Sequence, residues 1–218
     1  MIGGELLGAY CLSEPGSGSD AAALVTRAES IDGGYRLNGT KAWITHGGVA
    51  DFYTVMARTG EHRTKGISCF LVEGDSDGLS AAAPEDKMGM RGSRTAQVIL
   101  DDVAIPADRL IGAEGEGFTI AMAALDAGRL GIAACAVGVA QAALTEAVAY
   151  ANTRKQFGQA IAEFQGISFM IADMATGVEA ARSLYLSAAR RKDAGLDYST
   201  QAAMAKLFAT DVSMSVTT

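Results

Sequence analysis

The chain has 218 residues, and a compact fold of this length buries about 70% of the surface of the extended chain. Hydrophobic residues make up 49% of the sequence and charged residues 20%, which excludes simple disorder. The net charge of −7 argues against general binding to nucleic acids or anionic membranes, so an anionic ligand would need a few locally placed basic residues.

The first 112 residues predict a mainly antiparallel sheet, because short β-rich runs alternate with turn signals. Asp32-Gly33-Gly34 predicts the turn of a hairpin, and Asn38-Gly39 predicts a second tight turn soon after it. In chain order, the expected strands are 25–31, 35–37, 40–45, 52–58, 67–73, 79–83 and 95–103.

The apolar period becomes helical after residue 113. A first helix is expected from near Gly117 to just before Gly158, and a second ends at Gly195. A third begins with Ser199 as its cap and is still running at Thr218. The first two helices carry stripes expected to be buried: Val137, Ala140, Leu144, Val148 and Ala151, then Ile167, Met170, Met174, Val178, Ala181, Tyr185 and Ala188.

These patterns predict an α+β fold with two domains. Residues 1–112 would form a mainly antiparallel, β-barrel-like domain, and residues 113–218 an incomplete antiparallel helical bundle. The first five residues have no basic signal, and the longest uncharged helical run, 130–145, is shorter than the roughly 20 residues of a membrane span. We therefore predict a cytoplasmic protein without membrane insertion.

Metal and disulfide chemistry find little support in the residue types. The three cysteines, Cys11, Cys69 and Cys135, lie far apart, and the histidines are His46 and His62. Neither a zinc site nor a disulfide framework fits this pattern, so we expect no metal and a reducing compartment.

The most informative stretch is 11–20, which reads CLSEPGSGSD. By composition it is a strand that ends in a Gly/Ser turn, either a plain turn or one whose amides and hydroxyls hold a phosphate. Its order of residues resembles the signature loop of the acyl-CoA dehydrogenases. Three further blocks follow in that family's order, namely KAWIT at 41–45, LDAGR at 125–129, and RKQFG at 154–158 with Phe164-Gln165 after it.

The resemblance implies a flavoprotein that binds FAD and an acyl-CoA substrate. In this family a base removes the α-proton of an acyl thioester while the β-hydrogen moves as hydride to FAD. The residues implied to contact FAD are Tyr10, Leu12, Ser13, Gly18 and Ser19 of the loop, with Trp43, Ile44 and Thr45 of the next block. Ser19 would also approach the CoA part of the substrate.

Two groups in the helical half have implied binding roles. Asp126 and Arg129 lie three residues apart, so they share a helix face and can form a local ion pair. By resemblance they line the channel for CoA and pantetheine. Arg154 could simply compensate the charge at a helix end, but the resemblance implies contacts with the FAD of a neighbouring subunit from four residues: Arg154, Gln156, Phe157 and Gln165. Such a shared site requires an oligomer.

The catalytic base of the family has no counterpart in this sequence. In most members it is a glutamate on a segment beyond the position that matches Thr218, and in a minority it precedes the arginine that matches Arg129. Gly128 occupies that second position, so we assign no catalytic residue. A complementing subunit would have to supply the base. The resemblance also implies a homo-oligomer or such a complementing subunit, and an electron-transfer flavoprotein is the usual electron acceptor of the family.

The leading hypothesis is therefore the core of an FAD-dependent acyl-CoA dehydrogenase. Two alternatives remain open. One is a non-catalytic fragment or subunit that binds flavin or CoA and needs a partner chain. The other is a flavin oxidase or monooxygenase of the same fold. Asp126 and Arg129 favour an enzyme that binds a CoA thioester over this second alternative.

Overall fold

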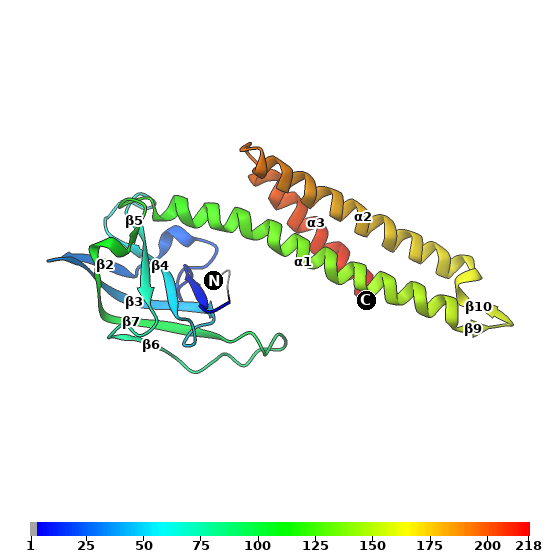
Figure 1. Cartoon of the computed structure of the whole chain (residues 1–218), viewed down its shortest axis with the longest axis horizontal. Coiled ribbons are helices and arrows are strands. Elements are labelled where there is room, and N and C mark those ends of the chain that lie inside the picture. Colours follow the sequence, from blue (N-terminus) through cyan, green and yellow to red (C-terminus); the bar gives the residue numbers. More distant parts are fainter. Residues whose placement is uncertain (1–3) are drawn as a thin grey trace. The chain divides into compact units, whose positions relative to one another are not determined.

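The structure is a computed structural model that describes residues 4–218. The chain forms two compact units, Met1–Met122 and Ala123–Thr218. The first contains a mainly antiparallel sheet and the second is helical, which confirms the predicted α+β fold class (Figure 1). The units divide within the first long helix, whereas the sequence places the domain boundary at residue 112.

Eight strands form the sheet of the first unit in the order β6-β7-β3-β2-β4-β5-β8, with β1 pairing with β4. The β1–β4 pairing is parallel, as is a single residue pair between β2 and β4, and the other pairings are antiparallel. The strands are β1 (Gly8–Cys11), β2 (Arg27–Ile31), β3 (Gly34–Thr45), β4 (Phe52–Arg58), β5 (Ile67–Glu73), β6 (Leu79–Ala81), β7 (Thr95–Pro106) and β8 (Leu110–Ile111).

Several local predictions are confirmed. Strands β4 and β5 have the predicted bounds, and the hairpin turn at Asp32-Gly33 brings Ile31 opposite Gly34. The expected strand at 25–31 begins only at Arg27, because Val25 is exposed and its N–H bonds a side chain instead of a strand.

The predicted turn at Asn38-Gly39 is wrong, because β3 runs through it without reversing. The register of β3 against β7 shifts between Leu37 and Gly39. Asn38 makes two hydrogen bonds to Asp102 on β7: its Nδ2 donates to Oδ1 over 2.9 Å, and its Oδ1 accepts the Asp102 N–H over 2.9 Å. A β-bulge therefore occupies the place of the expected turn, stabilised by a partner 64 positions away.

The core of the first unit contains large side chains that project from the strands of the sheet. Tyr53, Phe70, Leu37 and Val55 are buried, and the ring of Tyr35 packs on Phe70 with centroids 4.9 Å apart. Burial of each such side chain contributes about 1.5–3 kcal/mol.

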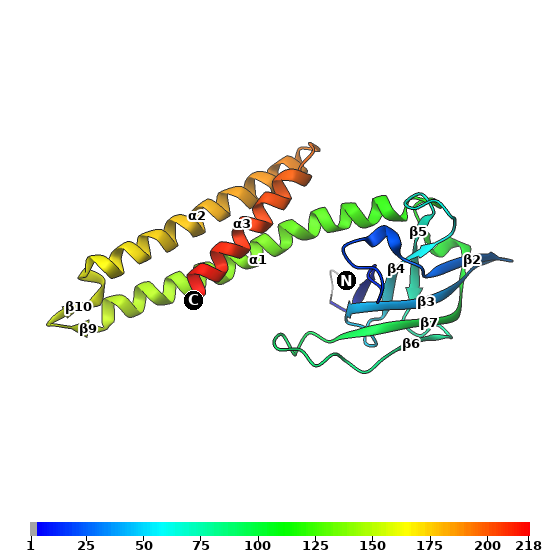
Figure 2. The same cartoon turned by 180° about the vertical axis from the view of Figure 1, so that it is seen from behind.

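The second unit contains three helices in which α2 and α3 lie beside α1, as Figure 2 shows from behind. These are α1 (Gly117–Thr153), whose first turns belong to the first unit, α2 (Gln165–Asp193) and α3 (Ser199–Thr217). A small hairpin of β9 (Lys155–Gln156) and β10 (Gln159–Ala160) joins α1 to α2. Three short 3₁₀ helices complete the chain, η1 (Ala21–Ala23), η2 (Ala107–Arg109) and η3 (Ile161–Glu163).

Most residues of the predicted apolar stripes belong to the core between these helices or pack against it. Val137, Leu144 and Val178 are buried together with alanines of α3. Met170 is 62% exposed, so its place in the buried stripe is wrong. The prediction of Ser199 as a helix cap is also wrong, because Tyr198 holds the cap position. The carboxylate of Asp197 accepts the N–H of Ser199 over 3.2 Å.

Helix α1 is the one helix of the described residues that is long and apolar enough to cross a membrane. Core helices of water-soluble folds have the same length and composition, and one face of α1 packs against α2 and α3. The absence of membrane insertion therefore stays a prediction.

Candidate functional site

The loop after β1 forms a compact turn with an exposed tip. Glu14 and Ser17 exchange two backbone hydrogen bonds, 2.8 and 3.1 Å long, and the Ser17 hydroxyl donates to the carbonyl of Asp20 over 2.8 Å. Gly18 and Ser19 follow at the exposed tip. Beyond Gly18 there is open space, since a Cβ there would meet no atom within 4 Å. The tip can therefore present backbone and hydroxyl groups to a ligand.

The start of the loop is anchored in an apolar cluster. Leu12 is buried with Leu24 and Met56, and Ser13 is half-buried. Tyr10 packs against the same cluster, and its hydroxyl donates to the carbonyl of Ala121 over 3.4 Å. Burial, with a smaller contribution from Cys69, raises the pKa of Tyr10 to about 12. Tyr10 is therefore a neutral hydrogen-bond donor at ordinary pH.

Trp43 is held in an unusual backbone conformation at a second bulge in β3. The register against β7 shifts between Lys41 and Ile44, so that Ala42 and Trp43 share the place of one residue. Trp43 has φ 60° and is 66% exposed. A bulky residue with positive φ is a rare outlier, and such strain is concentrated at functional sites. The bulge therefore directs the indole out of the core.

The residues after Trp43 alternate between the core and the surface. Thr45 is exposed, whereas the side chain of Ile44 is buried in the core of the sheet. Ile44 can therefore face a ligand only through its backbone. The Ala42 N–H donates to the carbonyl of Ser13 over 2.9 Å and joins this strand to the loop. The fold thus brings the start of the loop beside the strand that carries Trp43 and Thr45.

In the second unit, Asp126 and Arg129 form the predicted ion pair on α1. Their side chains are partly buried, with 22% and 39% exposure. The other carboxylate oxygen of Asp126 accepts a hydrogen bond from the hydroxyl of Ser199 at the start of α3. Sequence reasoning missed this contact, because the two residues are 73 positions apart. Asp126 therefore links two helices as well as pairing with Arg129.

Gly128 lies between these two residues and is exposed. A Cβ at this position would meet no atom within 4 Å, so a longer side chain would fit here. The glycine itself offers no acid or base.

The second implied group lies on the hairpin between α1 and α2. Arg154 and Gln156 are exposed there, and Gln165 is exposed at the start of α2. Phe157 has φ 51°, is 94% exposed, and makes an edge-on contact with Phe164 at 6.2 Å between centroids. Like Trp43, it is an aromatic residue held outward by a strained backbone.

The two groups of the helical unit do not form one site within this chain. Arg154 directly follows α1, and 25 positions separate it from Arg129, which corresponds to about 37 Å along the helix. Asp126 and Arg129 therefore lie far from the hairpin that carries Arg154.

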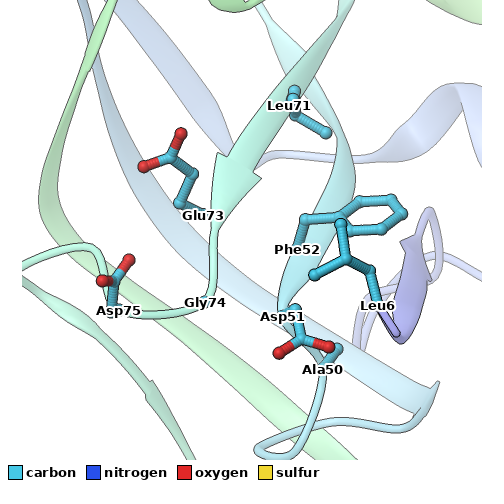
Figure 3. A pocket seen from close by; sticks show the side chains of 8 residues that line it. All are labelled: Leu6, Ala50, Asp51, Phe52, Leu71, Glu73, Gly74 and Asp75. Atoms are coloured by element: carbon cyan, nitrogen blue, oxygen red, sulfur yellow. The ribbon is translucent and has the colours of Figure 1, made fainter. Parts of the chain in front are cut away.

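The first unit also contains an open hollow. It has a volume of about 680 Å³, and Figure 3 shows Leu6 beside Phe52 at one side, with Glu73 and Asp75 on the other. Asp51 at its edge accepts the Leu7 N–H over 2.6 Å, and Glu73 pairs with Arg109. None of the predicted binding residues lines this hollow.

Comparison with known proteins agrees with the arrangement of both units. Residues 9–103 match the model of the acyl-CoA dehydrogenase middle domain, and residues 115–218 match that of the acyl-CoA dehydrogenase C-terminal domain. Among curated relatives, a short-chain specific acyl-CoA dehydrogenase of Clostridium acetobutylicum is 47% identical over 99% of this chain and 57% of its own length.

Solved structures show the same fold. Butyryl-CoA dehydrogenase from Megasphaera elsdenii is 46% identical with a TM-score of 0.93, over 97% of this chain and 56% of that one. PigA with FAD and proline is 31% identical with a TM-score of 0.94, over 99% of this chain and 56% of that one. The chain thus spans little more than half the length of these relatives. With both halves matched in order, the chain belongs to the acyl-CoA dehydrogenase family.

Proposed function

We propose that this chain forms the flavin- and thioester-binding part of an FAD-dependent acyl-CoA dehydrogenase. The observation that carries the proposal is the contact between the start of the signature loop, at Ser13, and the strand that exposes Trp43 and Thr45. The hydrogen bond from Ala42 to Ser13 holds these two segments together.

The residues present fit a flavin nucleotide. An exposed indole offers a flat surface for a ring system, and the open turn at Gly18 and Ser19 offers polar groups for a pyrophosphate. When bound, FAD would supply the acceptor for the hydride that leaves the β-carbon of the substrate. The protein groups then orient the ring and hold the phosphates.

Asp126 and Arg129 are proposed to bind the CoA part of an acyl-CoA substrate. Partly buried charges cost free energy unless they are paired, and here each partner satisfies the other on a stretch of α1, 117–145, that has no other charged residue. PigA, whose structure contains FAD and proline, shares the fold, so the fold alone does not select a thioester. The Asp126–Arg129 pair is the feature of this chain that favours a thioester substrate.

The α-proton would be removed by a base from outside this chain, because Gly128 cannot act as one. General base catalysis contributes about 10²- to 10⁴-fold to rate. We therefore expect the chain to bind its ligands without turnover. The hairpin with Arg154 and Phe157 is proposed to contact the FAD of a neighbouring subunit, which requires a homo-oligomer or a complementing subunit. An electron-transfer flavoprotein is the proposed electron acceptor.

The first test is to purify the chain, add FAD, and record the absorption spectrum before and after anaerobic addition of butyryl-CoA. We expect bound flavin whose spectrum shifts with butyryl-CoA but is not bleached. Arg129→Ala should weaken the response to butyryl-CoA while FAD binding is retained. A folded chain that binds no FAD would contradict the proposal.

A matched pair of variants tests the missing base. Gly128→Glu adds a carboxylate where the structure has room, and Gly128→Gln adds a side chain of the same size that is not a base. We expect butyryl-CoA to bleach the flavin with the first variant only. Binding without bleaching in both would favour a non-catalytic binding subunit. Fast reoxidation of chemically reduced flavin by air would favour an oxidase.

A further inference from the structure

A buried ion pair lies beneath the proposed flavin site. The Lys41 ammonium on β3 is 2.8 Å from Oε1 of Glu14 in the loop after β1. The exposed fractions of the two side chains are 0% and 3%. Burial of two charges costs several kcal/mol per ion unless geometry and further hydrogen bonds compensate. Burying this pair therefore costs free energy, and neither group takes a direct part in the proposed chemistry.

The remaining hydrogen bonds of the pair have a fixed direction. Lys41 Nζ also donates to the carbonyl of Leu12 over 3.3 Å. Glu14 accepts the N–H of Val25 at Oε2 over 2.6 Å and that of Thr26 at Oε1 over 3.0 Å. Position 14 must therefore accept hydrogen bonds, and position 41 must donate them.

These bonds join the segments that carry the proposed flavin contacts. Lys41 holds the carbonyl of Leu12 at the start of the loop, and Glu14 belongs to the turn that leads to Gly18 and Ser19. The next residue after Lys41, Ala42, bonds Ser13, and Trp43 follows at the bulge.

The ionisation of both groups agrees with a tightly coupled pair. Burial lowers the pKa of Lys41, against the attraction of Glu14. Burial alone would raise the pKa of Glu14, but Lys41 and the hydrogen bonds outweigh it and leave that pKa below its usual value.

We propose that Glu14 and Lys41 are positioning residues that lock the signature loop onto the Trp43 strand in the geometry that binds flavin, without contacting the flavin themselves. This inference rests on the proposed function, because it concerns the affinity of the same site.

The test compares Glu14→Gln/Lys41→Met, which removes both charges and keeps similar shapes, with Glu73→Gln/Arg109→Met, which removes both charges of a more exposed pair in the same unit. For each we would measure circular dichroism, hydrogen exchange at the amides of 12–19, and the Kd for FAD. We expect a folded first variant with faster exchange at these amides and a Kd raised by about 10- to 100-fold, the usual cost of losing an orienting partner. The control should match wild type.

A charge-swapped variant, Glu14→Lys/Lys41→Glu, distinguishes the attraction between opposite charges from the direction of the hydrogen bonds that Glu14 accepts and Lys41 donates. It keeps opposite charges but leaves the amides of Val25 and Thr26 without their acceptor, so we expect it to bind FAD no better than the first variant. Wild-type affinity in the folded Glu14→Gln/Lys41→Met protein would overturn the positioning role alone. A wild-type chain that binds no FAD would overturn the proposed function and this inference together.

Discussion

The two units are built from cores of opposite character. The sheet unit buries large side chains such as Tyr53 and Phe70, together with the charged Lys41. The core of the helical unit consists largely of alanines, and several large apolar residues lie on its surface, among them Phe169, Met170, Met204, Leu207 and Met214.

This difference affects how each unit presents its functional residues. In the sheet unit, the buried contacts of Lys41 fix the start of the loop, and a bulge in β3 fixes the direction of Trp43. In the helical unit, small side chains let the helices approach closely, and the functional residues extend from helix faces and ends. The sheet site therefore depends on its core, whereas Arg154 and Phe157 depend on a local turn.

The largest expected difference between the cores concerns two phenylalanines. Phe70→Ala removes a fully buried ring and should lower the free energy of unfolding by about 3–5 kcal/mol. Phe169→Ala removes a ring that is 62% exposed and should change it by less than about 0.5 kcal/mol. Urea denaturation followed by circular dichroism measures both, and equal losses would contradict the comparison.

In the alanine core, enlarging a side chain should destabilise the protein, by less than the removal of a large side chain costs in the sheet unit. Ala205 is fully buried between helices, so Ala205→Leu should overpack the helical unit and cost about 1–3 kcal/mol. Ala203 lies exposed on the same helix, and Ala203→Leu is the matched control with almost no expected cost. Thermal unfolding at 222 nm reports on both, and a stable Ala205→Leu protein would mean that the helices have room between them.

Alkaline pH should destabilise the sheet unit through its buried thiols. Burial raises the pKa of Cys11 from 9.0 to about 12, partly offset by Lys41, and burial raises that of Cys69 to about 11. Because the unfolded chain loses these protons first, the stabilisation is complete below pH 9 and is lost as the pH rises toward 11–12.

Each thiol should contribute a slope of up to about 1.4 kcal/mol per pH unit in this window. Cys11→Ala should therefore flatten the dependence of unfolding free energy on pH. Cys135 is exposed in the helical unit, so Cys135→Ala should leave the slope unchanged. If the unfolding free energy fell with pH equally steeply in both variants, burial of the Cys11 thiol would not contribute to the pH dependence.

Local periodicity was enough to predict much of the fold. The bounds of β4 and β5, the hairpin at Asp32-Gly33 and the three helices follow from the spacing of apolar residues and from turn residues. The candidate site residues were taken from the ordered sequence blocks, because those blocks are contiguous. What they could not predict is which side of a strand each residue faces, as Ile44 demonstrates.

Only the tertiary structure decided the remaining features, because each depends on a partner far away in the sequence. Asn38 lies in a bulge and not in a turn because Asp102 pairs with it from β7. The buried Lys41–Glu14 pair and the contact of Ser199 with Asp126 arise in the same way. The sequence by itself determined the elements and the residue types of the site, and long-range hydrogen bonds determined how those residues are held.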